Sequence, residues 1–300
     1  MIRNITLLAL VLVLFSCKKQ NEPAVTEPAQ EALHEVNFTM SGFRATTGVL
    51  STPAVKATNA VGDTLKKYAD NLYYRIYNAK GEWIRSIDQT STNGDFGTIT
   101  DRLPAGTYQV FLAACKGQLF VSGKDYNYTN GYITLASTRV WNDTFTKTFT
   151  LTVGNTDVSQ TVRLERLVAG CQIVLPDGLP ATVTKLKIVV IGDYNYASFA
   201  AAMLYNTGLS EYNYEFSGTT STGTNTFSFL VSNNVTPVNI YITAYNSTGI
   251  LMVDKRLFDL KFERNKMTTI TGNLFPRGSV PTDFTVGVNP NWDTGNTERY

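Results

Sequence analysis

Short stretches in which apolar and polar residues alternate recur along almost the whole chain, and they constrain the fold more than any other feature. The stretch VNFTMSGF, for example, places Val36, Phe38 and Met40 on one side and Asn37 and Thr39 on the other. Such a period of two is typical of a β-strand with one buried face. We therefore expect an all-β protein.

Turn-forming residues separate these stretches, as in an antiparallel β-sandwich. The clearest hairpin is NLYYRIYNAKGEWIRSI, residues 71–87, with its turn at Asn78–Gly81. Further strands are predicted at 106–114, after Leu103-Pro104-Ala105-Gly106, and at 144–153. The one stretch with helical spacing is ASFAAAMLY, residues 197–205, where apolar residues recur four apart.

The length favours two domains. The 300 residues minus the first 16 leave 284, which is too many for one typical domain. The strand pattern starts afresh at QTVRLERLVAGCQIVLP. We expect one antiparallel sandwich over residues 35–158 and a second over 159–300.

The chain begins with an apolar run, Ile5 to Phe15, that follows Arg3 and is about half the ~20 residues of a membrane-spanning helix. This is typical of a signal peptide, here residues 1–16. The sequence Leu14-Phe15-Ser16-Cys17 resembles the lipobox of bacterial lipoproteins, in which the cysteine becomes the lipidated first residue. The alternative is an ordinary secreted protein with a chance cysteine near its cleavage site. Residues 17–34 are expected to form a flexible tether.

Charge and residue types argue against several functions. Lys and Arg number 26 and Asp and Glu 24, so no excess of charge favours nucleic acid. The only histidine is His34, which removes Ser/His/Asp and Cys/His arrangements and any His/Cys zinc cluster. We expect no enzyme activity, no metal and no cofactor apart from a covalent lipid on Cys17.

Two cysteines, Cys115 and Cys171, remain in the mature chain. Because an exported protein permits a disulfide, they could form one bridge. They also fit two buried free thiols in different domains. Both alternatives stay open at this point.

Several segments, taken in order, resemble the fimbrillin superfamily of Bacteroidetes fimbriae, especially its lipidated anchor and minor subunits. These segments are the lipobox, the polar tether, VNFTMSGF, LYYRIYNAKGEWI, LPAGTY, VRLERLVA and FERNKMTTITGNLF. The resemblance spans nearly the whole chain. It implies two tandem Greek-key, transthyretin-like (prealbumin-like) β-sandwiches and a role in anchoring or building a surface fibre in cell adhesion.

The resemblance also implies assembly by β-strand addition. Polymerising members of the family lose their first strand to an arginine-specific protease, and Arg44 is where such a cut could fall; the alternative is a solvated arginine in a turn. An anchor subunit would instead keep the first strand, because the cut would separate the fold from its lipid. The residues for strand exchange are Val36, Phe38 and Met40 in the first strand and Phe284, Val286 and Val288 in the last.

A short motif of tyrosine and asparagine recurs three times. Each copy carries an acid before Tyr-Asn-Tyr, and the tyrosines are Tyr126, Tyr128, Tyr194, Tyr196, Tyr212 and Tyr214. Aromatic rings beside amides and carboxylates suit a sugar-binding surface, although Tyr and Asn are also ordinary in β-proteins. The alternative function is therefore an outer-membrane lipoprotein that binds polysaccharide.

The expected location is the outer membrane, with the fold at the cell surface or in the fimbrium. The expected partners are other fimbrial subunits and the membrane itself through the lipid, together with a ligand on a host or bacterial surface. Lys18 and Lys19 followed by a single acid, Glu22, match only in part the pattern of surface-exposed lipoproteins in this bacterial group.

Overall fold

The computed structural model describes residues 31–41, 61–135, 140–200, 204–217, 222–275 and 283–290. Residues 32–300 belong to one compact unit. The described residues contain many β-strands and one helix, α1 (Val61–Tyr68), and no described helix is long and apolar enough to cross a membrane. The predicted all-β fold class is confirmed.

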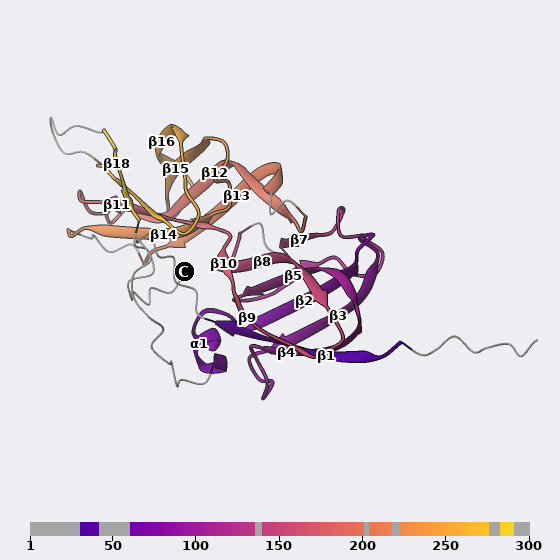
Figure 1. Cartoon of the computed structure of the whole chain (residues 1–300). Helices are drawn as coiled ribbons and strands as arrows, with labels where there is room; N and C mark the ends of the chain where they lie inside the picture. The colour runs from indigo at the N-terminus through magenta and orange to yellow at the C-terminus, as the bar shows by residue number, and fades with distance from the viewer. Residues whose placement is uncertain are drawn as a thin grey trace, which may run out of the picture. The chain divides into compact units, whose positions relative to one another are not determined.

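The first sandwich consists of two sheets around one core (Figure 1). The three-stranded sheet has the order β4 (Thr98–Pro104), β1 (Leu33–Ser41), β9 (Val158–Arg163). The five-stranded sheet has the order β10 (Glu165–Arg166), β8 (Thr144–Val153), β5 (Gly106–Cys115), β2 (Asn71–Asn78), β3 (Trp83–Thr90). Side chains from both sheets meet in the core because each strand turns alternate residues inward.

The second sandwich is built in the same way around its own core. Its four-stranded sheet has the order β14 (Asn225–Val231), β11 (Ala169–Leu175), β17 (Met267–Thr271), β18 (Thr285–Asn289). The other sheet has the order β16 (Leu251–Leu260), β15 (Val238–Asn246), β12 (Val183–Ser198), β7 (Tyr132–Leu135), β6 (Leu119–Val121), and β13 (Leu204–Glu215) also pairs with β12.

The two sandwiches repeat one strand topology. In the first, β1 pairs antiparallel with β4 and parallel with β9; in the second, β11 pairs antiparallel with β14 and parallel with β17. The facing sheets correspond as well, β3-β2-β5-β8 with β13-β12-β15-β16. Strand β18 is an addition, and β17 is its partner among the described strands.

Strands β6 and β7 lie between β5 and β8 in the chain, yet β7 pairs with β12 of the second sandwich. A third cluster of buried residues joins the two halves there, and it includes Phe111 and Trp141 from the first half and Phe199 from the second. The Trp141 indole donates a 2.6 Å hydrogen bond to the carbonyl of Tyr194. This buried contact makes the two sandwiches parts of one compact unit.

The strand pattern of the sequence is largely confirmed, but the expected helix is wrong. Ala197 and Ser198 end β12, and Tyr205 lies in β13. Phe199 lies in a turn directly after β12, and its ring stacks on Phe111 with 3.9 Å between centroids. The helix that does exist, α1, was not predicted, and its Leu65 reaches the first core.

The expected domain boundaries can be compared with the pairing. Strand β1 begins at Leu33, two residues before the expected start, so that His34 lies in a strand. Strands β9 and β10 follow residue 157 but pair with β1 and β8. We propose that the change from the first sandwich to the second falls between Arg166 and Ala169.

Candidate functional site: an aromatic patch on strands β6, β7 and β12

The three Tyr-Asn-Tyr copies occupy different kinds of structure. The first lies in the loop between β6 and β7, the second inside β12 and the third inside β13. Their side chains therefore face different surroundings, although the motif is the same.

The tyrosines of the third copy turn towards the second core. The Tyr214 hydroxyl donates a 2.9 Å hydrogen bond to the carbonyl of Ser228, and the Tyr212 hydroxyl donates to the carbonyl of Leu230. Burial raises the pKa of Tyr214 to about 12 and that of Tyr212 well above its ordinary value. These hydroxyls serve the fold, since their hydrogen bonds are made inside the protein.

Tyr194 and Tyr128 are also engaged in packing. Tyr194 is buried in the cluster between the sandwiches. The ring of Tyr128 packs edge-on against Tyr77 with 5.7 Å between centroids, and burial raises the pKa of Tyr128. Neither ring belongs to the surface group described next.

The two remaining tyrosines, Tyr126 and Tyr196, meet on the surface. Both contact Tyr132, with centroids 5.3 Å apart in each pair, and Phe120 lies 5.7 Å from Tyr132. We call Phe120, Tyr126, Tyr132 and Tyr196 the aromatic patch. Phe120 is 46% exposed, and the three tyrosines are partly exposed.

Strand register explains why these rings gather. Thr134 of β7 lies opposite Phe120 of β6 on one side and Tyr196 of β12 on the other, so the three side chains share one face. The Thr134 hydroxyl donates a 2.7 Å hydrogen bond to the carbonyl of Asn195. The other face of β7 carries Ile133, which is buried between the sandwiches.

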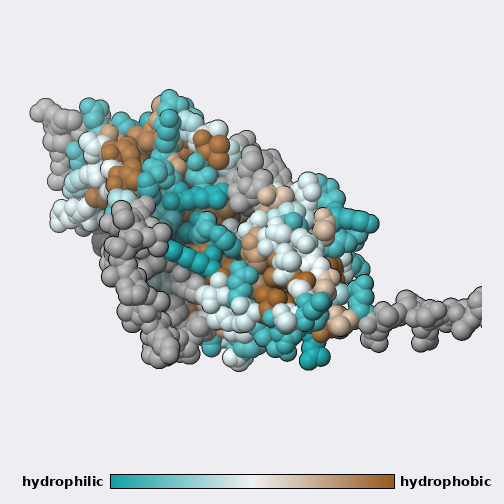
Figure 2. Space-filling model, viewed as in Figure 1, coloured by the Kyte–Doolittle hydropathy of each residue, from teal (hydrophilic) through white to brown (hydrophobic). Residues whose placement is uncertain are grey.

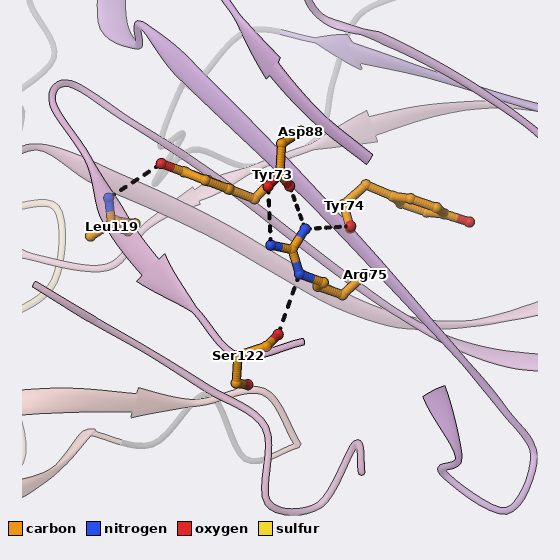
Figure 3. Close-up of polar contacts among 6 residues, drawn as sticks. All are labelled: Tyr73, Tyr74, Arg75, Asp88, Leu119 and Ser122. Carbon is orange, nitrogen blue, oxygen red and sulfur yellow. Dashed lines mark hydrogen bonds and ion pairs between the residues drawn. The ribbon is translucent and has the colours of Figure 1, made fainter. Parts of the chain in front are cut away.

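A polar network fixes β6 to the first sandwich (Figure 3). The guanidinium of Arg75, in β2, donates to both carboxylate oxygens of Asp88 in β3 and to the carbonyl of Ser122, next to β6. The Leu119 amide donates a 3.2 Å hydrogen bond to the Tyr73 hydroxyl. Because Arg75 is only 5% exposed, its bond to Ser122 is made away from water and holds the base of the patch, whereas the Asp88 side chain is 54% exposed.

The same network continues into the patch strand. The Ser122 hydroxyl accepts a 2.8 Å hydrogen bond from the amide of Tyr132, and the Ser122 amide donates a 3.0 Å bond to the Tyr132 carbonyl. The backbone of Tyr132, the central residue of the patch, is therefore hydrogen-bonded to Ser122, and Ser122 is hydrogen-bonded to the buried Arg75.

The acids of the motif have structural roles in two of the three copies. Asp193 is fully buried and accepts hydrogen bonds from the hydroxyls of Ser210 and Ser232. Glu211 pairs with Lys187 at 2.6 Å, and these contacts lower the pKa of Glu211. Asp125, beside the patch, is exposed.

The first-strand candidates for exchange lie in the core. Val36, Phe38 and Met40 are 0%, 0% and 1% exposed, and β1 has a partner strand on each side. They are therefore among the best-protected residues of the first sandwich.

The last strand is different. Val286 and Val288 are 52% and 49% exposed, while Phe284 is partly buried against the second core. Figure 2 shows hydrophobic residues gathered at the upper left, in the region where Figure 1 draws β18. Strand β18 therefore has one unpaired edge and an apolar outer face among the described residues.

Cys17 and Arg44 lie outside the described residues. Cys115 and Cys171 are both free and buried, so the alternative of a bridge between them is wrong. Burial raises the pKa of Cys115 to about 12 and that of Cys171 well above its ordinary value. Both are thus protonated at neutral pH and unsuited to nucleophilic chemistry.

A small hollow of about 180 Å³ lies between β5, β8, β10 and the end of β12. Phe111 lines it together with Arg264 and the ion pair Lys147–Glu165, which spans 2.6 Å. Desolvation lowers the pKa of Arg264. In the described parts of the chain, no group of three His, Cys, Asp or Glu side chains could hold a metal ion.

The fold and the site define a protein of two like β-sandwiches with a surface patch of aromatic rings. The chain belongs to a family of unknown function, DUF6562, whose model matches residues 30–299. A comparison with curated protein sequences gave no match.

Several solved structures from Bacteroides and Porphyromonas species share this fold. A candidate polysaccharide-binding protein from Bacteroides thetaiotaomicron has a TM-score of 0.54 and 9% identity, covering 86% of this chain and 96% of its own. A candidate adhesin from the same species has a TM-score of 0.53 and 11% identity, covering 88% and 98%. The fimbrial anchor protein Mfa2 from Porphyromonas gingivalis has a TM-score of 0.51 and 9% identity, covering 86% and 98%. The predicted likeness of fold to fimbrial proteins is confirmed.

Proposed function

We propose that this chain is a non-enzymatic surface lipoprotein that serves as an anchor or structural subunit of a fimbria in cell adhesion. The observation that carries the proposal is the match of nearly the whole chain to folds that include a fimbrial anchor protein and a candidate adhesin. Two strands supply what assembly by strand addition would use, the central β1 and the edge strand β18.

In this proposal the lipid on Cys17 holds the protein at the outer membrane, and residues 18–32 link it to the fold. Each buried methylene of an acyl chain contributes about 0.8 kcal/mol, so several chains would make attachment effectively permanent. The fold then faces the cell exterior, where its partners are other fimbrial subunits.

Strand β1 favours the anchor role. Full burial of one large apolar side chain is worth about 1.5–3 kcal/mol, so Val36, Phe38 and Met40 together represent roughly 5–9 kcal/mol. A whole domain is stable by only about 5–15 kcal/mol. Cleavage at Arg44 and loss of β1 would therefore unfold the first sandwich unless a strand from a neighbour replaced it.

Strand β18 is the part best placed to meet a neighbour. No other described strand pairs with its outer edge, and Val286 and Val288 offer apolar side chains at alternate positions. A partner strand added there would extend the sheet and cover part of both valines.

The test is the intact mass of the N-terminal peptide of the protein isolated from native outer membrane, together with a search for the protein in sheared surface fibres. An acylated Cys17 joined to residues 36–40, in material that copurifies with fibres, is expected. A chain that begins at Ala45 would overturn the anchor role in favour of a polymerising subunit. Absence from fibres would overturn the fimbrial role.

A second candidate function is polysaccharide binding at the outer membrane. The aromatic patch is the observation that favours it, because it places Tyr126 and Tyr196 from two copies of the motif in one surface group.

A further inference from the structure

We propose that the aromatic patch binds an uncharged oligosaccharide chain, with Tyr132 as the central contact. The inference rests on the second candidate function and assigns it a site, including two residues, Phe120 and Tyr132, that the repeated motif does not contain. It does not depend on fimbrial assembly.

The exposure of these rings is the first argument. Many other described aromatic side chains of the first half are buried, and Tyr74 and Tyr77 are fully so. In the patch, four rings instead contact one another at the surface, and Phe120 leaves nearly half of its area in water. Grouped exposed apolar residues of this kind mark binding sites in soluble proteins.

The orientation of the rings is the second argument. The plane of Tyr132 makes angles of 86° with Tyr126, 67° with Tyr196 and 34° with Phe120. The ring faces thus point in different directions, which suits a single chain that bends across them better than a flat polymer surface. The negative face of an aromatic ring attracts the polarised C–H groups of a sugar ring.

Polar groups beside the rings match the hydroxyls of a sugar. The hydroxyls of Tyr126 and Tyr132 lie 3.5 Å apart, so one sugar hydroxyl could contact both. The exposed Asp125 and Asn127 flank Tyr126 in the adjoining loop. Asn127 uses its carbonyl oxygen to accept a hydrogen bond from the Asn130 amide, which leaves its amino group for a ligand.

The charge of the patch decides between classes of ligand. Phenyl and phenol side chains carry no charge at neutral pH, and neither does Thr134, which lies between Phe120 and Tyr196. The adjoining loop adds one exposed cation, Lys124, and one exposed anion, Asp125. Because these opposite charges cancel, neither a polyanion nor a polycation gains from long-range attraction.

Preorganisation is the last argument. The central Tyr132 is bonded through both backbone groups to Ser122, whose carbonyl accepts from the buried Arg75. Tyr196 is held by the β7–β12 pairing. A site held on strands in this way loses little conformational entropy when a ligand binds.

The experiment is isothermal titration of the chain from residue 18 onward, which retains the compact unit 32–300. The probes are maltoheptaose, laminarihexaose, cellohexaose and mannohexaose as uncharged chains and oligogalacturonate as the charged comparison. We expect at least one uncharged probe to bind and oligogalacturonate to bind more weakly.

The variants test the residue assignment. Tyr132→Ala is expected to weaken binding roughly tenfold or more, whereas Tyr132→Phe keeps the ring and most of the affinity. Tyr245→Ala is the matched control, because Tyr245 is a partly exposed tyrosine opposite Lys185, at the other end of β12 from Tyr196. Urea unfolding of each variant checks that the fold is intact.

Four outcomes would overturn the proposal. They are no binding of any uncharged probe, stronger binding of oligogalacturonate, equal effects of Tyr132→Ala and Tyr245→Ala, and self-association in sedimentation that Tyr132→Ala abolishes. Sugar binding that is unchanged by Tyr132→Ala would leave polysaccharide binding standing and reject this site alone.

Discussion

At the scale of single residues, Asp193 and Asp125 show how one motif serves two purposes. Both precede Tyr-Asn-Tyr, but Asp125 is exposed and Asp193 is fully buried. One carboxylate oxygen of Asp193 accepts 2.9 Å hydrogen bonds from the amides of Ser232 and Asn233, and the other accepts a 2.6 Å bond from the Ser210 hydroxyl. Asp193 therefore ties β12 to β13 and to the end of β14.

Replacing this carboxylate tests that role. Asp193→Ala should lower the free energy of unfolding by about 3 kcal/mol, because it leaves buried amides and a hydroxyl without their acceptor. Asp125→Ala, the same change in the exposed copy, should alter it by less than about 0.5 kcal/mol. Urea denaturation followed by circular dichroism measures both, and equal effects of the two substitutions would contradict the role of Asp193.

At the scale of elements, strands β6 and β7 depend on an arginine in another sheet. Arg75→Met should lower the free energy of unfolding by about 1–3 kcal/mol, since it leaves the carbonyl of Ser122 buried without a donor. Amide exchange in residues 119–122 should accelerate, which mass spectrometry of peptides can follow.

The matched control for this change is Arg256→Met. Arg256, like Arg75, pairs with an aspartate, Asp254, and lies over a tyrosine ring, Tyr241, but its side chain is 54% exposed. An exposed pair of this kind contributes little to stability, because water and salt screen it. If the two variants lost the same stability, the buried network would not be what holds β6.

The sequence predicted those elements whose alternation is regular. Strands β2, β5 and β8 agree closely with their predicted ranges, because the apolar residues that alternate along each of them face the first core. Strands β6 and β7 were missed, since three or four residues are too few to show a period. The patch could be predicted only in part: the motif pointed to Tyr126 and Tyr196, but strand register brings in Phe120 and Tyr132.

Strand β18 depends on a packing contact that the alternation of apolar and polar residues does not indicate. A Cβ atom at Gly272 would overlap the ring of Phe284, so the glycine makes room for the residue that precedes β18. Gly272→Ala should therefore displace Phe284 and detach β18, with faster amide exchange over residues 285–289. Gly154→Ala is the control, because a Cβ atom there has nothing within 4 Å. Unchanged exchange in Gly272→Ala would show that β18 does not depend on this packing.

At the scale of the whole molecule, both halves bury groups that ionise only at high pH. Burial raises the pKa of Cys115 and of Tyr77 to about 12 in the first half, and that of Tyr214 to about 12 in the second. The cluster between the sandwiches contains Cys115 and Tyr77, so ionisation there strains both halves. Alkaline pH should therefore act on the molecule as one unit.

The sign of the effect follows from proton binding. In the unfolded chain, thiols ionise near pH 8.5 and phenols near pH 10, whereas the buried groups keep their protons to higher pH. Above about pH 8.5 the unfolded state binds fewer protons than the folded state, so the free energy of unfolding falls as pH rises. The urea midpoint should be insensitive to these groups below about pH 8 and should fall steadily up to about pH 11.

In the double variant Cys115→Ala, Cys171→Ala, only the phenols remain, and the onset of the fall should move towards pH 10. An onset that stayed near pH 8.5 in this variant would rule out the thiols as the cause of the fall. A urea midpoint that did not change with pH in the parent chain would refute the burial of neutral thiols and phenols as a determinant of stability.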